Sequence, residues 1–164
     1  MTQWIPAYVA LGSNLDGPAA QVVRAFEALA ALRDTRLVLR SSLYASLPFG
    51  PVAQPDFVNA VAGMLTTIAP REFLAELKSI EQRLGRARQL ERWGPRRIDL
   101  DLLVHGTARI AEPGLAVPHA GMAERAFVLA PLAEIAPDLD VPGLGRVSTL
   151  LANVSSDGLA RIAT

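Results

Sequence analysis

The sequence has no cysteine, which excludes disulfide frameworks, zinc ribbons and thiol nucleophiles. It has no charge excess, because sixteen basic and sixteen acidic residues cancel, whereas a general nucleic-acid-binding protein carries a basic surplus. It also lacks the ~20 uninterrupted apolar residues of a membrane span and the basic start and apolar run of a signal peptide. These absences predict a cytoplasmic protein that binds neither nucleic acid nor a membrane.

What is present is enough for one packed domain. The chain has 164 residues, of which 51% are hydrophobic and 20% charged, and a chain of this size needs no disulfide or structural metal. Because no internal repeat or linker interrupts it, we expect a single domain spanning residues 1–164. We further expect this domain to act as a monomer.

The spacing of apolar residues predicts a βαββαβ order of elements. It predicts strands at residues 4–11, 35–45, 57–67 and 98–104, and helices at 18–32, 70–84 and 127–135. Gly12–Asn14 is interpreted as the turn after the first strand. This order is typical of the α+β class, with a ferredoxin-like antiparallel sheet and helices packed on it. A C-terminal extension of loops and short helices follows.

Asp99 and Asp101 are the strongest chemical signal. Residues two apart on a strand point to the same face, so the two carboxylates should lie roughly 7 Å apart along it. A divalent cation would relieve their repulsion, and Mg²⁺ takes one or two carboxylates together with phosphate and water oxygens. The alternative is a structural network in which both aspartates pair with arginines. His105 is an even number of positions from both aspartates, so a regular strand would point it to the same face, but we assign it no role.

An arginine-rich loop at residues 86–97 lies directly before the aspartates and contains five arginines. Guanidinium groups beside a metal-binding acid pair suit phosphoryl transfer, because they clamp the part of a polyphosphate that the metal leaves exposed. The alternative is a solvated basic loop, or partners for Glu81 and Glu91. The G-x-x-x-x-G-K-[ST] motif is absent, so the chain is not a P-loop kinase.

A proline-rich loop at residues 46–55 leads to Phe57 and Asn59, which share one strand face. A ring beside an amide could bind a flat heterocycle, because an amide both donates and accepts hydrogen bonds. The alternative is an ordinary hairpin loop with Phe57 in the core. His119 follows Pro118, and a histidine in such a loop is more often a surface residue than a functional one.

These residues resemble the 6-hydroxymethyl-7,8-dihydropterin pyrophosphokinase family. The most specific resemblance is the run RWGPRRIDLDLL at residues 92–103. Further matching segments occur in the family's order between residues 8 and about 138: Val9–Asn14, Ser41–Tyr44, Gly50–Pro51, Gln54–Ala60, Glu81, Val117–His119 and Arg125–Phe127. The loop at residues 46–49 and Ala120 depart from familiar members, and Ala120 weakens the case for one nucleotide contact.

The resemblance implies a catalytic set for this chain, with two Mg²⁺ ions on Asp99 and Asp101. It implies that the triphosphate of the co-substrate ATP is contacted by Arg88, Arg96 and His119. It also implies that Glu81 and Arg125 lie near the nucleotide. It places Arg86 and Arg88 on a loop that closes over the site. The implied catalytic residues are therefore Arg86, Arg88, Arg96, Asp99 and Asp101.

The resemblance also implies a pterin site. The ring would lie between Phe57 and Phe127, while Asn59 and the backbone of the Ser46–Phe49 loop, including Leu47, read its edge. Trp93 would help to seal the site. The expected reaction is attack of the pterin hydroxyl on the β-phosphorus of ATP, with release of AMP.

Two other functions compete with this one. A ferredoxin-like RNA-binding module would explain the sheet, the aromatics and the arginines, but the net charge is zero and no RNP1-like strand is visible. A metabolite-binding regulatory domain would need no metal pair, so it leaves Asp99 and Asp101 unexplained.

Overall fold

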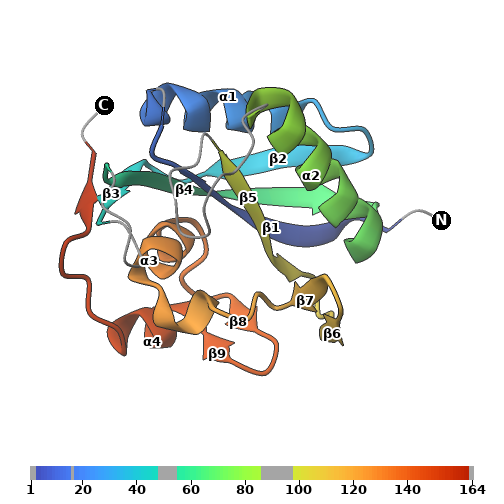
Figure 1. Cartoon of the computed structure of the whole chain (residues 1–164). Coiled ribbons are helices and arrows are strands. Elements are labelled where there is room, and N and C mark those ends of the chain that lie inside the picture. Colours follow the sequence, from blue (N-terminus) through green and yellow to red (C-terminus); the bar gives the residue numbers. More distant parts are fainter. Residues whose placement is uncertain (1–2, 16, 48–54, 86–97, 163–164) are drawn as a thin grey trace.

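The structure is a computed structural model that describes residues 3–15, 17–47, 55–85 and 98–162. The first half contains β1 (Ile5–Ser13), α1 (Pro18–Ala30), β2 (Thr35–Arg40), β3 (Tyr44–Ser46), β4 (Phe57–Thr66) and α2 (Pro70–Gly85). The second half contains β5 (Asp99–His105), β6 (Ile110–Glu112), β7 (Leu115–Val117), the 3₁₀ helix η1 (Met122–Glu124), α3 (Ala126–Ile135), β8 (Asp140–Val141), β9 (Gly145–Arg146), α4 (Val147–Ala152) and β10 (Ala160–Arg161). The expected mixture of helices with an antiparallel sheet is confirmed (Figure 1).

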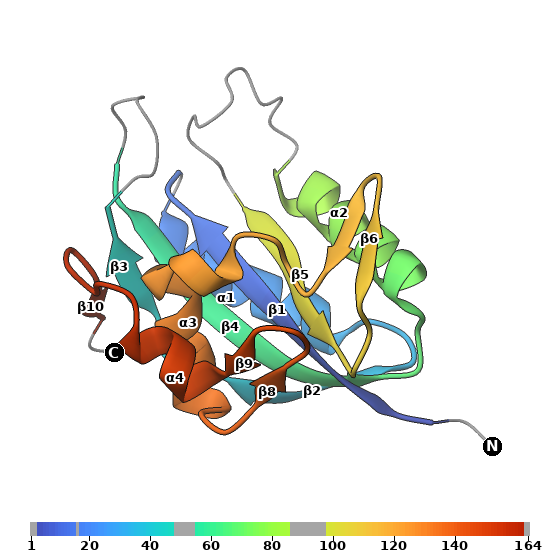
Figure 2. The same cartoon turned by 90° about the horizontal axis from the view of Figure 1, so that it is seen from below.

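One six-stranded antiparallel sheet organises the molecule. Its strands run in the order β10-β3-β4-β1-β5, and β2 pairs with β4 beside β3. Helices α1 and α2 cover one face, and α3 and α4 lie on the other (Figures 1 and 2). Each face buries its own core: Phe26, Phe73 and Leu77 belong to the first, and Val61 and Leu129 to the second.

The predicted single strand at residues 35–45 is wrong, because the structure has two strands there. Between them, the Ser41 N–H donates to the Val61 carbonyl at 2.9 Å, and the Ser41 hydroxyl accepts from the Val61 N–H at 2.8 Å. A side-chain oxygen therefore takes the place of a backbone carbonyl, which lets the chain bend while β4 keeps its hydrogen bonds.

The prediction that His105 points to the same face of the strand as the aspartates is also wrong, because β5 has a bulge. Tyr8 is opposite Val104 and Val9 is opposite Leu102, so Leu103 is an extra residue. The bulge turns His105 to the face of α2, where its ring meets Phe73 edge-on at 6.0 Å between centroids. His105 is buried and its Nε2 bonds the Ile68 carbonyl at 2.8 Å. It is therefore a core residue that lies away from the aspartates.

The sequence predicts a turn at residues 12–14, but the first two of these residues belong to β1, which runs to Ser13. The buried Asn14 donates from Nδ2 to the Pro55 carbonyl at 2.9 Å. It thereby ties the end of β1 to the residues that precede β4. Among the residues that the structure describes, no helix is both long and apolar enough to cross a membrane.

Candidate functional site

A row of directly paired residues crosses the sheet and defines the candidate site. Tyr44 of β3 pairs with Asn59 of β4, Asn59 pairs with Gly12 of β1, and Gly12 pairs with Asp99 of β5. Directly opposite residues project to the same face of a sheet. That face is the one toward α3, because the Tyr44 hydroxyl donates to Glu134 of α3 at 2.7 Å. Asn59 and Asp99 therefore lie on one face with only a glycine between them.

The two aspartates show the predicted alternation. Asp99 and Asp101 are half-buried on the face of α3, whereas Leu100 between them is fully buried in the other core. Within the described ranges, no group of three or more metal-ligating side chains gathers at any point. A pair of carboxylates fits Mg²⁺, which takes its remaining ligands from water and phosphate oxygens. The two carboxylates are therefore a donor set that fits Mg²⁺.

Glu81 of α2 supports the strand that carries the aspartates. Its Oε2 accepts a hydrogen bond from the Leu100 N–H at 2.7 Å, and its Oε1 lies 3.5 Å from Nζ of Lys78. Burial raises the pKa of Glu81, the Leu100 N–H and Lys78 act in the opposite direction, and Asp101 adds to the rise. The structure thus places Glu81 beside the acid pair, in contact with the backbone between its two members.

His119 lies near enough to Asp101 for that charge to act on it, and hydrogen bonds with Leu103 and Gly121 hold it in place. Its N–H donates to the Leu103 carbonyl at 2.9 Å, and its Nδ1 accepts from the Gly121 N–H at 3.2 Å. Burial lowers the pKa of His119, and the charge of Arg125 lowers it further against the opposing effect of Asp101. A neutral ring that accepts at Nδ1 carries its proton on Nε2. His119 is therefore a partly buried donor rather than a surface residue.

The start of α3 brings a cation and an aromatic ring to the same region. The Arg125 guanidinium lies 5.9 Å from the centroid of the Phe127 ring. It passes close over Gly121, where an added Cβ would meet its Cζ at 2.9 Å. Since the Gly121 N–H also donates to His119, Gly121 lies between His119 and Arg125, and Arg125 in turn contacts Phe127.

Asn59 is oriented by Ser46. The buried Asn59 donates from Nδ2 to the Ser46 hydroxyl at 2.6 Å, and its Oδ1 lies 3.3 Å from the point where a Cβ on Gly12 would be. Phe57 is only half-buried and belongs to neither core cluster, which argues against a purely core role. Leu47 beyond Ser46 is 63% exposed. The structure thus brings Ser46, Phe57 and Asn59 together next to Gly12.

Five predicted site residues lie outside the described residues: Phe49, Arg86, Arg88, Trp93 and Arg96. Sequence reasoning, in turn, gave no role to Gly12, Tyr44 or Glu134. A side-chain-free position in an otherwise apolar strand was the available signal for Gly12. No local signal could have found the Tyr44–Glu134 contact, because the two residues are 90 positions apart.

Fold and site together fit one class of protein: an α and β enzyme that transfers phosphate-containing groups between small molecules. Comparison with known families then makes the assignment specific. The model of the family 7,8-dihydro-6-hydroxymethylpterin-pyrophosphokinase (HPPK) matches residues 8–137. The chain belongs to this family.

Individual relatives agree with this assignment. The 2-amino-4-hydroxy-6-hydroxymethyldihydropteridine pyrophosphokinase of Pseudomonas aeruginosa is 49% identical over 155 residues, which cover 94% of this chain and 95% of that protein. The enzyme of the same name from Haemophilus influenzae is 44% identical over 158 residues, covering 96% and 98%.

Solved structures extend the likeness to the fold. Plasmodium falciparum HPPK-DHPS, crystallised with pteroate, matches with a TM-score of 0.78 at 14% identity. The match covers 100% of this chain and 49% of that chain, so the chain spans about half of that longer protein. At this identity the likeness concerns the fold alone.

Proposed function

We propose that the chain transfers the pyrophosphoryl group of ATP to the hydroxymethyl group of 7,8-dihydro-6-hydroxymethylpterin, a step of folate biosynthesis. One observation carries the proposal at the level of the site. Asn59 and Asp99 flank Gly12 in a single row of paired residues, so a ring-reading amide and a metal-binding acid face the same space. With strands ~4.8 Å apart, their backbones are separated by roughly 10 Å, which suits a pterin beside a phosphate chain.

Asp99 and Asp101 would hold the magnesium. Bound Mg²⁺, in two ions by family resemblance, would orient the triphosphate and neutralise its charge. The residues of the chain then have to bring the pterin oxygen in line with the β-phosphorus. The new bond joins that oxygen to the β-phosphorus, the bond from the β-phosphorus to the oxygen bridging to the α-phosphate breaks, and AMP leaves. The hydroxyl proton passes to water or to a phosphate oxygen.

The pterin would lie over Gly12, stacked between Phe57 and Phe127. Because Ser46 accepts from Nδ2 of Asn59, the amide is held with Oδ1 toward Gly12. In that orientation Oδ1 can accept a hydrogen bond from an N–H of the pterin edge. Leu47 and Phe49 would complete this side of the ring site.

The triphosphate would be bound by donors at the other side of the site. His119, neutral and with its proton on Nε2, would donate a hydrogen bond to the triphosphate without adding a second positive charge beside Arg125. Arg125 supplies the permanent cation near the start of α3. The roles of Arg86, Arg88, Arg96 and Trp93 remain proposals that rest on the family resemblance. Action as a monomer in the cytoplasm is part of the same proposal.

Nucleotide chromatography tests the function directly. The protein is incubated with ATP, Mg²⁺ and the reduced hydroxymethylpterin, and we expect AMP to form only when the pterin is present. Formation of ADP, or turnover that does not depend on the pterin, would contradict the proposal. The family assignment does not support the RNA-binding or regulatory alternatives.

A further inference from the structure

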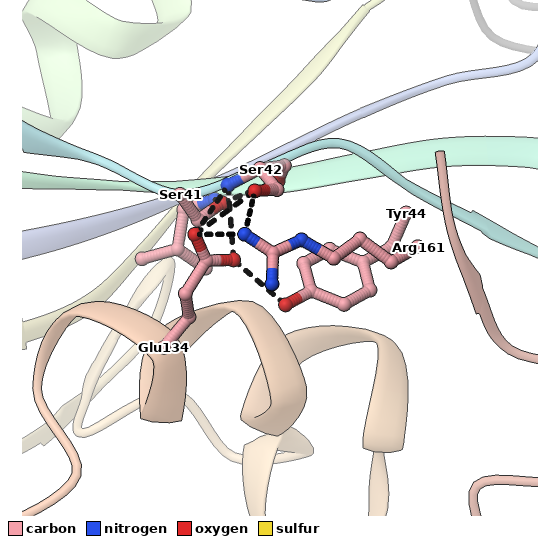
Figure 3. A network of polar contacts seen from close by, with 6 residues as sticks. Ser41, Ser42, Tyr44, Glu134 and Arg161 are labelled. Atoms are coloured by element: carbon pink, nitrogen blue, oxygen red, sulfur yellow. Dashed lines mark hydrogen bonds and ion pairs between the residues drawn. The ribbon is translucent and has the colours of Figure 1, made fainter. Parts of the chain in front are cut away.

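Near its C-terminal end, α3 carries a carboxylate that binds the segment leading into β3 through several donors. The two oxygens of Glu134 accept from the Ser42 N–H at 3.0 Å each. The Ser42 hydroxyl donates at 3.0 Å and the Tyr44 hydroxyl at 2.7 Å. Arg161 of β10 lies 3.2 Å from the same carboxylate and also donates to the Ser42 hydroxyl. One side chain therefore joins α3, β3 and β10 (Figure 3).

The charges in this network are fixed near neutral pH. Burial opposes ionisation of Glu134, but the hydrogen bonds from Tyr44 and Ser42 and the charge of Arg161 outweigh it and lower the pKa of Glu134. Burial, the hydrogen bond and the charge of Glu134 raise the pKa of Tyr44 to about 12, while Arg161 acts in the opposite direction. The contact is thus a hydroxyl donating to a carboxylate, which is stronger than a bond between neutral groups.

Glu134 and Phe127 lie on the same face of α3, since they are seven residues apart. Seven residues are about two helical turns, or roughly 10 Å along the axis. Pro131 lies between them and has no N–H to donate to the carbonyl of Phe127, so this turn lacks one helical hydrogen bond. The direction in which Phe127 points is therefore set less by the helix's own hydrogen bonds and more by how α3 is held on the sheet, through its apolar packing and the Glu134 contacts.

On the sheet, the Glu134 network reaches β3, the strand that pairs with the proposed pterin residues of β4. Tyr44 is directly opposite Asn59, and Ser46 is directly opposite Phe57. Ser46 in turn holds the Asn59 amide. The Glu134 carboxylate consequently connects the element that carries Phe127 with the strand that orients Asn59.

We infer that Glu134 is a positioning residue that sets the separation between Phe127 and the sheet, and thereby the affinity for the pterin. The inference rests on the proposed function, because it assumes that Phe127, Phe57 and Asn59 bind the ring. The aspartates lie on β5, at the opposite end of the row from Tyr44. Loss of the Glu134 hydrogen bonds therefore weakens pterin binding far more than nucleotide binding, which reaches α3 only through Arg125 at its start.

The test compares Glu134→Ala and Glu134→Gln with the wild type. We measure the Kd for the pterin, the Kd for a magnesium complex of a non-hydrolysable ATP analogue, and KM and kcat for both substrates. Losing hydrogen bonds to a charged group should raise the pterin Kd and KM of Glu134→Ala by at least about tenfold. Glu134→Gln keeps one acceptor oxygen and should lie between Glu134→Ala and the wild type. The Kd for the ATP analogue should rise by only about threefold or less, because Arg125 at the start of α3 is one of several proposed triphosphate contacts and the aspartates lie on β5.

Two further variants keep the test decisive. Asp138→Ala removes an exposed carboxylate just beyond α3, whose one oxygen lies 3.9 Å from Arg146, and it should bind the pterin as the wild type does. Tyr44→Phe deletes a single hydroxyl, so it carries the test if Glu134→Ala does not fold, with a smaller rise in the pterin Kd.

Unchanged pterin affinity in folded Glu134→Ala would overturn the inference. So would an equal loss of affinity for both substrates, because that result indicates general loosening. A wild-type protein that binds no pterin would instead overturn the proposed function, and the inference with it. The wild-type measurement therefore tells the two failures apart.

Discussion

At the scale of single residues, Gly12 matters for the space that it leaves free. A Cβ at this position would lie 3.3 Å from Oδ1 of Asn59 and 4.0 Å from Phe57, which is where we place the pterin. Gly12 lies within β1, paired on both sides, and a strand accepts β-branched residues. Glycine is therefore needed here to keep the space above the sheet open.

Gly12→Val should raise the pterin KM at least about tenfold, because overpacking a fitted site costs on the order of 1–3 kcal/mol. Gly114→Ala is the control, since Gly114 lies in the turn between β6 and β7 with a φ of 77° and nothing within 4 Å of an added Cβ. Alanine at that φ strains the backbone without filling space at the site, so this variant should change stability and leave the pterin KM unaltered. Equal effects of the two variants on the pterin KM would rule out a ring site at Gly12.

The acid pair gives the second prediction at this scale. Asp99→Asn and Asp101→Asn keep the side-chain shape but remove the negative charge that attracts Mg²⁺, so each should lower kcat at least about a hundredfold. The fold should survive, because both side chains are only half-buried. Glu112→Gln is the control, as its exposed carboxylate pairs with Arg71 on the surface. Turnover and magnesium titrations decide the matter, and near-normal kcat in both asparagine variants would remove the metal site.

At the scale of elements, β5 is an edge strand whose outer side is held by α2 through Glu81. Glu81→Ala leaves the Leu100 N–H without this acceptor and should lower the free energy of unfolding by about 1–3 kcal/mol. Burial raises the pKa of Glu81, so a charge is costly there and the acceptor oxygen matters most. Glu81→Gln should therefore retain most of the stability in urea unfolding.

Lys78→Ala is the matched control, because it removes only the exposed partner of Glu81. Surface ion pairs contribute about 0–1 kcal/mol, so its effect should be small. Faster amide exchange at Leu100 in Glu81→Ala alone would place the loss on β5. A stable Glu81→Ala with a protected Leu100 amide would show that α2 does not hold this strand.

Most elements follow from the spacing of apolar residues, because each face of a strand or helix here packs on one core. Pro18 does open α1 after Gly17, whose φ of 70° suits glycine. The exceptions arise where another strand decides the outcome. The break at Ser41 depends on Val61, and the bulge at Leu103 depends on the register against β1. Neither partner can be identified from the local sequence. For this reason the predictions of one strand at residues 35–45 and of His105 on the face of the aspartates were wrong.

At the scale of the whole molecule, the fold gathers residues from distant segments on one face of the sheet. Sequence reasoning could propose Asp99, Asp101, Phe57 and Asn59, because alternation on a single strand places each pair. The roles of His119, Arg125 and Phe127 came only from the family resemblance, since how they approach the sheet depends on long-range packing. Glu134 was missed for the same reason: its partners lie in β3 and β10.

The same network predicts how the stability of the whole fold varies with pH. The pKa of Glu134 is lowered from its ordinary value of 4.5, so its ionised form stabilises the folded state. That contribution is fully present above about pH 4.5 and is lost as the pH falls through the lower pKa of the folded protein. Glu134→Gln lacks this titration, so its deficit against the wild type should be constant near neutral pH and shrink in acid.

Urea unfolding of both proteins in magnesium-free buffer, from pH 7 down to pH 3, measures that difference, and the other carboxylates cancel because both proteins share them. The Tyr44→Phe variant gives an independent check, since it removes the hydroxyl that is the largest single cause lowering the pKa of Glu134. Its deficit should also narrow in acid, because a protonated Glu134 no longer accepts a charge-assisted bond from Tyr44. A deficit that stays constant down to pH 3 in both variants would mean that Glu134 does not stabilise the fold through its charge, and that shape alone holds α3 on the sheet.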